Sequence, residues 1–119
     1  MKILIVDDSR FTQKIEGNLL KKNMPNSEIY YASNGEEGLE KYKELEPDFA
    51  IIDLLMPGMS GLELIKKIKE YDEKAKLVVV SADVQEKVRK EVDSLGTNGF
   101  INKPLNEEKV AEILKCIGV

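Results

Sequence analysis

Residues 2–8 read KILIVDD, a short and mostly apolar run that is followed at once by two aspartates. A run of this length and composition is typical of a strand in a parallel sheet that is covered on both faces. Similar runs recur along the chain, and longer segments with apolar residues at helical spacing separate them. The expected strands span 2–6, 28–32, 49–52, 77–80 and 99–101. The alternation predicts five βα units around one parallel sheet.

Apolar stripes predict the helices between these strands, because residues three or four apart share one helix face. The stripes are Phe11/Ile15/Leu19, Leu62/Ile65/Ile68, Val84/Val88/Val92 and Val110/Ile113/Ile117. Capping boxes predict three helix starts, namely Ser33 with Glu36, Ser60 with Glu63 and Asp83 with Glu86. The second helix, around 36–45, has a thin stripe and contains Gly38, which lowers helix propensity. Right-handed crossovers and short connections then restrict the topology to a three-layer, doubly wound α/β sandwich.

Length and composition predict one folded domain over residues 1–119, with no room for an output domain. The net charge of -4 argues against nucleic acid or anionic lipid as a partner. No apolar stretch approaches the ~20 residues that span a bilayer, so membrane insertion is not expected. Cys116 is the only cysteine and cannot form an internal disulfide. A cytoplasmic, monomeric protein is the simplest expectation.

Polar side chains follow four of the expected strands directly or within two residues. Asp7 and Asp8 follow the first strand, Asp53 the third, Ser81 the fourth and Lys103 the fifth. Because the carboxyl ends of parallel strands share one edge of a sheet, these side chains are expected to converge there. Open α/β folds bind their ligands at that edge.

Three neighbouring carboxylates repel one another, by roughly 4 kcal/mol for a pair 4 Å apart in a surface-like dielectric. A hard divalent cation relieves this repulsion. The chain has no histidine, so the oxygen ligands favour Mg²⁺, or Mn²⁺, over zinc or copper. Mg²⁺ commonly shares oxygens with phosphate, which makes a phosphoryl group the natural substrate. Asp53 would attack phosphorus in line, the metal and Lys103 would neutralise charge, and Ser81 would donate a hydrogen bond.

Each residue also has a plainer interpretation when it is taken alone. Asp8 is a good N-cap for the first helix, and Ser81 is a reasonable turn residue before a helix capped by Asp83. Lys103 alone resembles a solvated surface lysine, and Asp53 alone an ordinary loop acid. Their joint placement at strand ends favours a functional site.

Four short motifs carry a resemblance to a known family. They are Asp7-Asp8, Asp53 with Met56-Pro57 and Gly61, Ser81-Ala82, and Lys103-Pro104. In this order and spacing they resemble the receiver domain of bacterial response regulators, in particular its single-domain, CheY-like members. The resemblance runs over residues 1–119 and implies a flavodoxin-like (βα)5 sheet of strand order 2-1-3-4-5.

The resemblance also implies a role for each site residue. Asp53 would be the phosphoacceptor and, with Asp8, a metal ligand. Asp7 would bind the metal directly or through a water molecule. The other implied roles are the Leu55 backbone carbonyl as a metal ligand, Lys103 and Ser81 as contacts of the phosphoryl group, Phe100 as an aromatic switch, and a cis Lys103–Pro104 peptide.

Two positions depart from the common family pattern. Phe100 stands where tyrosine is common, so the inward ring loses one hydrogen bond while still filling the space behind Ser81. Leu55, two residues after the acceptor, is apolar where a polar residue is frequent in fast-cycling members. We expect Leu55 to shield the phosphoryl group from water and slow its hydrolysis.

Three other functions compete with that of a phosphoacceptor. A phosphatase with an aspartyl intermediate would need a second acid at the place of Leu55. A flavin or nucleotide binder would need a phosphate-cradling loop after the first strand, where Asp7 and Asp8 instead repel phosphate. An interaction module of receiver fold that takes no phosphate remains the alternative to a phosphoacceptor.

The partners follow from the same reasoning. Without histidine the chain cannot carry its own phosphohistidine donor, so a histidine kinase or phosphotransfer protein must act in trans. Output is expected through a downstream effector protein. The resemblance implies that this effector binds the face formed by the fourth helix, fifth strand and fifth helix. Lys87, Lys90 and Lys109 are expected to be exposed on that face. Chemotaxis-type regulation is favoured, and a phosphorelay intermediate or a phosphate sink stays open.

Overall fold

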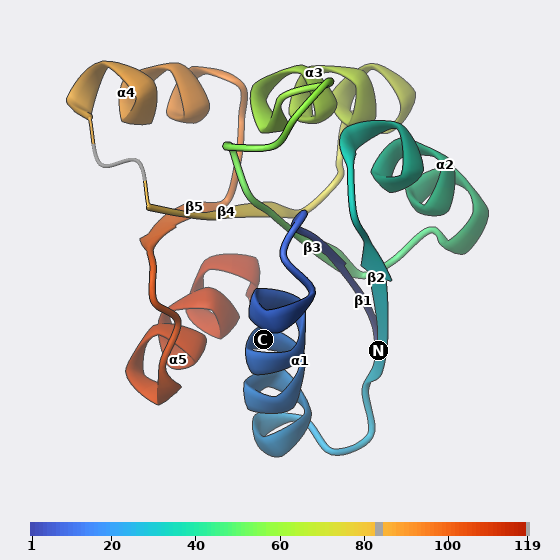
Figure 1. Ribbon diagram of the computed structural model, residues 1–119, viewed down its shortest axis with the longest axis vertical. Helices are drawn as coiled ribbons and strands as arrows, with labels where there is room; N and C mark the ends of the chain where they lie inside the picture. Colours follow the sequence, from blue (N-terminus) through green and yellow to red (C-terminus); the bar gives the residue numbers. More distant parts are fainter. Residues whose placement is uncertain (83–84, 119) are drawn as a thin grey trace.

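Five parallel strands form one sheet in the order β2-β1-β3-β4-β5, as a computed structural model of the chain shows (Figure 1). The structure describes residues 1–82 and 85–118. The strands are β1 (Lys2–Val6), β2 (Glu28–Ala32), β3 (Phe49–Ile52), β4 (Leu77–Ser81) and β5 (Gly99–Asn102). The predicted sheet, its direction and its order are confirmed, and β4 and β5 each run one residue further than expected.

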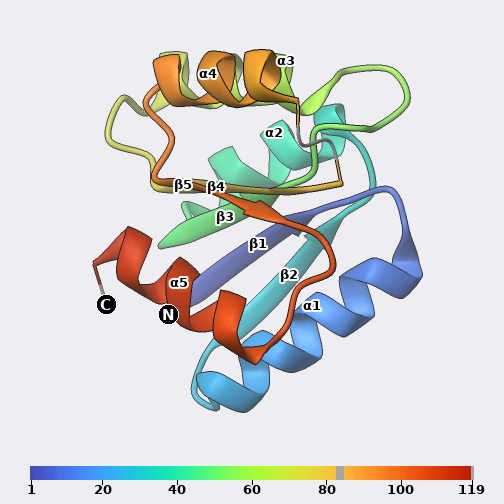
Figure 2. The ribbon, with the colours of Figure 1, turned by 90° about the vertical axis from the view of Figure 1, so that its left-hand side faces the viewer.

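Helices cover both faces of this sheet, and this produces the predicted three layers. The helices are α1 (Arg10–Asn23), α2 (Gly35–Leu45), α3 (Gly61–Tyr71), α4 (Glu86–Ser94) and α5 (Glu107–Ile117). Helices α2, α3 and α4 lie on one face, and α1 and α5 on the other (Figures 1 and 2). Within residues 1–82 and 85–118, no helix is both long and apolar enough to cross a membrane.

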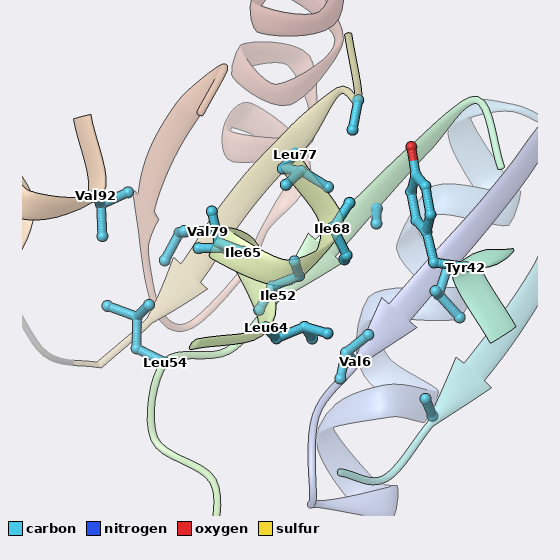
Figure 3. Packing of buried hydrophobic residues seen from close by; sticks show 14 of the residues in the cluster. Val6, Tyr42, Ile52, Leu54, Leu64, Ile65, Ile68, Leu77, Val79 and Val92 are labelled. Carbon is cyan, nitrogen blue, oxygen red and sulfur yellow. The ribbon is translucent and has the colours of Figure 1, made fainter. Parts of the chain in front are cut away.

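The core is divided by the sheet into two apolar clusters. In β1, Leu4 and Val6 pack with the α2, α3 and α4 layer, and Figure 3 shows Val6 in that cluster. Ile3 and Ile5 pack with α1 and α5. Each fully buried aliphatic side chain contributes about 1.5–3 kcal/mol. The α5 stripe is fully buried as predicted, and the α3 and α4 stripes are buried in part. The buried stripe residues are Ile65, Ile68, Val92, Val110, Ile113 and Ile117.

The predicted stripe of α1 is wrong at two of its three residues, because Phe11 is 75% exposed and Ile15 is 40% exposed. Leu19, the third residue, is partly buried and packs against the core cluster of this face. The face that packs inward instead is partly polar. Gly17 on this face lies close to the Tyr31 ring, where an added Cβ atom would overlap the tyrosine hydroxyl. The buried face consists of Gln13, Glu16, Gly17 and Leu20.

The capping box predicted for α2 is also wrong, by one residue. Asn34 is the N-cap, and its side chain accepts from the Glu37 amide at 2.8 Å. Glu37 in turn accepts from the Ser33 amide at 2.6 Å. Asparagine caps as well as serine does, and an acid stands three residues after each candidate. Sequence spacing therefore could not separate the two alternatives.

The other two capping boxes have different outcomes. Ser60 caps α3 as predicted, because its hydroxyl accepts from the Glu63 amide at 3.2 Å. Asp83, predicted to cap α4, lies outside the described residues together with Val84. Helix α4 begins at Glu86, with Gln85 in the N-cap position.

Two glycines let helices approach the strand ends closely. Gly38 in α2 is buried, and an added Cβ would lie 3.1 Å from side-chain atoms of Val6 and Leu64. Gly61, the first residue of α3, is more constrained, because its Cβ would overlap the Asp53 carbonyl and lie 2.7 Å from the Leu54 Cα. The glycine at 61 thus allows α3 to begin directly against the loop that follows β3.

We expect Gly61→Ala to lower the free energy of unfolding by about 2–3 kcal/mol, because overpacking against backbone atoms cannot be relieved by a rotamer change. Gly38→Ala is the matched control. Its methyl group meets only side chains, and the gain in helix propensity of ~1 kcal/mol offsets part of the strain. Urea unfolding of both variants measures the difference, and equal losses would contradict this account.

Candidate functional site

The sheet's own hydrogen bonding fixes the residues at its carboxyl edge. The Asp7 amide donates to the Ala32 carbonyl at 3.0 Å, and the Asp53 amide to the Val6 carbonyl at 3.0 Å. On the other side, the Lys103 amide donates to the Ser81 carbonyl at 3.0 Å. Parallel pairing therefore continues past the ends of the strands, and it places these side chains on rigid backbone.

A lysine bridges two buried acids at the centre of this edge. The Lys103 Nζ lies 2.8 Å from Asp7 Oδ2 and 3.1 Å from Asp53 Oδ2. Asp7 is 1% exposed and Asp53 is 5% exposed. Buried acids are found almost always with such a partner. The interpretations of Lys103 as a surface lysine and of Asp53 as a loop acid are therefore wrong. The Lys103–Pro104 peptide bond is cis.

Asp8 completes a cluster of carboxylates on the solvent side. One oxygen from each of Asp7, Asp8 and Asp53 lies within 4.8 Å of the other two. Asp8 does not cap α1, because Ser9 does so by accepting from the Thr12 amide at 3.2 Å. A compact set of carboxylate oxygens fits a hard divalent cation such as Mg²⁺.

Burial and charge act in opposite directions on the two central groups. Burial raises the pKa of Asp53 above its ordinary value, although the charge of Lys103 opposes this rise. Burial acts to lower the pKa of Lys103, but its hydrogen bond to Asp7 and the charge of Asp53 outweigh it, so that pKa is raised. Lys103 therefore remains charged. A single positive charge is shared among several acids.

Leu55 lies next to the acceptor candidate on the loop after β3. Its amide donates to Asp53 Oδ1 at 3.3 Å, and its side chain is 57% exposed. The amide contact helps to orient the Asp53 carboxylate, and the leucyl side chain is exposed to solvent. The ligand role of the Leu55 carbonyl stays a prediction.

Ser81 and Phe100 lie on the two strands nearest α4. Ser81 ends β4 opposite Asn102 and is fully buried, so the interpretation of Ser81 as a turn residue is wrong. The Phe100 ring is buried in the cluster beneath α3 and α4. The guanidinium carbon of Arg89 lies 5.3 Å from the centroid of that ring, within range of a cation–π interaction.

Of the three lysines expected at the α4-β5-α5 face, Lys87 and Lys90 are exposed. Lys109 is only partly exposed, because its ammonium donates to the carbonyls of Asn102 at 2.7 Å and Pro104 at 3.1 Å. It thereby ties the start of α5 to the segment that carries Lys103.

Sequence reasoning missed two polar residues of α1 that lie beneath the site. The Gln13 side chain donates to the Asp7 carbonyl at 2.6 Å and to the Ala32 carbonyl at 3.2 Å. Glu16 is 2% exposed, and its Oε2 has no hydrogen-bond partner among the described residues. Positions 13, 16, 17 and 20 have the spacing of one helix face, which was the available signal. Because Gln13 and Glu16 are polar, this face was not predicted to be buried.

Burial, followed by the charge of Asp7, raises the pKa of Glu16 to about 8. Asp53 acts in the same direction, whereas Lys103 lowers this pKa. Glu16 is therefore electrostatically part of the site, although its Oε2 has no hydrogen-bond partner within residues 1–82 and 85–118.

The chain is similar to known proteins in both sequence and fold. The family model described as "Response regulator receiver domain" matches residues 3–115. The chemotaxis protein CheY of Thermotoga maritima is 39% identical over 98% of this chain and 96% of its own. The chemotaxis protein CheY of Treponema pallidum is also 39% identical, over 98% of this chain and 81% of its own. A crystal structure of the CheX-CheY-BeF3-Mg complex from Borrelia burgdorferi superimposes with a TM-score of 0.92 at 32% identity, covering 100% of this chain and 90% of that one.

The raised pKa of Glu16 predicts how stability depends on pH. Between the ordinary value of 4.5 and about 8, the folded state holds a proton that the unfolded state has released. Stability therefore falls as the pH rises through this window. Without divalent cations, we expect the wild type to lose a few kcal/mol relative to Glu16→Gln between pH 5 and 8, at about 1.4 kcal/mol per pKa unit.

Denaturant unfolding at several pH values measures this difference. Glu28→Gln is the charge-matched control, because Glu28 is exposed at the start of β2 and should follow the wild type. Parallel pH profiles for Glu16→Gln and the wild type would contradict the prediction.

Proposed function

The chain belongs to the response regulator receiver domain family, and we propose that it accepts a phosphoryl group on Asp53 in a Mg²⁺-dependent reaction. One observation supports this most strongly. The Lys103 ammonium bridges Asp7 and Asp53 at the edge where three carboxylates come within 4.8 Å. An acceptor, a cation site and a charge-neutralising lysine are thus next to one another.

The chain's own residues would divide the reaction between them. An Asp53 carboxylate oxygen forms the bond to phosphorus while the bond from phosphorus to the donor's leaving group breaks. The Lys103 ammonium would follow the negative charge and pair with a phosphoryl oxygen. The Ser81 hydroxyl would donate a hydrogen bond to a second phosphoryl oxygen. Bound Mg²⁺ would neutralise charge on the phosphoryl oxygens, held by Asp7, Asp8, Asp53 and the Leu55 carbonyl.

Phosphorylation would be read out through Ser81 and Phe100. We propose that Ser81 moves toward the phosphoryl group and that the Phe100 ring fills the space it leaves. The ring is already buried and lies against Arg89 of α4, so its position is coupled to the α4-β5-α5 face. A change at Asp53 would thereby alter a surface that an effector protein contacts.

The phosphoryl donor would be a histidine kinase or phosphotransfer protein acting in trans, because this chain has no histidine. The similarity to chemotaxis proteins of comparable length supports a chemotaxis-type role. The domain would assist its own phosphorylation and dephosphorylation without turning over a separate substrate. We place it in the cytoplasm, where kinases form phosphohistidine from ATP.

Incubation with Mg²⁺ and acetyl phosphate tests the acceptor and the cation together. We expect an adduct of one phosphoryl group, about 80 Da by intact mass, on the wild type, because Asp53 supplies the attacking oxygen. Asp53→Asn and EDTA-treated protein are the controls and should show none. An adduct that persists on Asp53→Asn would refute the assignment, and no adduct from acetyl phosphate or a phosphorylated kinase would favour a phosphorylation-independent interaction module.

Leu55 is expected to set the lifetime of the phosphoryl group. Its side chain is exposed to solvent two residues after Asp53, where it would obstruct an attacking water. We expect Leu55→Asn to lose phosphate roughly fivefold faster, because an amide admits and orients water there. Loss of the adduct with time measures this.

Tyr71→Asn provides a control for that experiment, because Tyr71 is also an exposed apolar residue but lies at the far end of α3. Its adduct should decay at the wild-type rate. A Leu55→Asn adduct that decays no faster than the wild type would remove the shielding role.

A further inference from the structure

Glu16 is a buried acid that has no role in the proposed phosphoryl transfer. It is 2% exposed, and its Oε2 finds no hydrogen-bond partner among the described residues. Such a group destabilises the folded state, because a buried polar atom without a partner has lost its hydrogen bonds to water and gained none in return. An apolar side chain would fill the same position on α1 at lower cost. We therefore expect another state of the protein in which this carboxyl group has a hydrogen-bonding or ionic partner.

The place of Glu16 identifies which group could pair with it. Gln13, one turn earlier on the same face of α1, donates to the Asp7 carbonyl, so this face lies under the acidic cluster. Among the charges that act on Glu16 are two acids, Asp7 and Asp53, and a single cation, Lys103. Lys103 has a flexible four-carbon stem and three N–H donors. It is the natural partner.

In the structure, Lys103 is engaged elsewhere, with two of its donors on Asp7 and Asp53. These contacts compensate for the charge of the two buried acids. A divalent cation on the same carboxylates would take over that compensation and would repel the ammonium. Lys103 would then need another anionic partner until a phosphoryl group arrives.

We infer that Glu16 is a positioning residue for Lys103, whose carboxylate receives the ammonium when a divalent cation occupies Asp7, Asp8 and Asp53 before phosphorylation. This inference rests on the proposed function. No covalent step is involved, and the Glu16 carboxyl releases its proton to solvent as the ion pair forms. When the phosphoryl group arrives, Lys103 leaves Glu16 for a phosphoryl oxygen. Glu16 thus keeps the ammonium near the site without placing it beside the cation.

The decisive comparison is the affinity for Mg²⁺ alone against the affinity for Mg²⁺ with beryllofluoride, a mimic of the phosphoryl group. By calorimetry, we expect Glu16→Gln to bind Mg²⁺ alone roughly tenfold more weakly, because the displaced ammonium has lost its charged partner. With beryllofluoride present, Lys103 contacts fluoride in both proteins, and the affinities should agree within about twofold. A glutamine that only disturbed packing would weaken both.

Glu28→Gln, which removes the same charge from the surface, is the control and should match the wild type throughout. A crystal structure of the Mg²⁺-bound wild type should show Lys103 Nζ about 3 Å from a Glu16 carboxylate oxygen. This observation decides the matter even if Glu16→Gln folds poorly. The inference would be overturned if Lys103 still bridged Asp7 and Asp53 in that structure, or if Glu16→Gln bound Mg²⁺ as tightly as the wild type. Either result would leave the proposed function intact. Failure of the wild type to bind Mg²⁺ would overturn the proposed function together with the inference.

Discussion

The bridge from Lys103 to two buried aspartates is the interaction on which the rest of the site depends. Asp7 and Asp53 are held at the carboxyl edge of the sheet with almost no access to water, where unpaired charges would be very costly. One ammonium at 2.8 and 3.1 Å makes that burial tolerable. Burial still raises the pKa of Asp53 despite the charge of Lys103. A further positive charge at this edge would therefore stabilise the ionised carboxylate.

The surrounding fold keeps this bridge in place by holding the backbone of the residues that form it. The amides of Asp7, Asp53 and Lys103 each donate to the strand beside them, so all three residues extend the sheet by one position. Lys109 binds the carbonyls of Asn102 and Pro104 on either side of Lys103. Because both ends of the bridge stand on rigid elements, only the side chains need to move when the charges change.

Most of this arrangement was predictable, because it follows from strand patterning. Short apolar runs end in Asp7, Asp53 and Lys103, and parallel strands bring such ends together. The failure at α1 has an equally physical cause. Phe11 and Ile15 are apolar but exposed, whereas the inward face carries Gly17 close to the Tyr31 ring. Sequence periodicity registers hydrophobicity and does not register close packing at a glycine.

The inward face of α1 also accounts for the least favourable feature of the molecule. Because Gln13 and Glu16 face inward, a hydrogen-bond donor lies under Asp7, but a carboxyl oxygen of Glu16 has no partner in the part of the chain that the structure describes. Anything that binds the folded state and supplies positive charge stabilises it by mass action, and the gain is greater where acids are buried and under-compensated. A site that already had all its carboxylates paired would gain little from a bound cation, and such binding could then do little to drive a change of conformation.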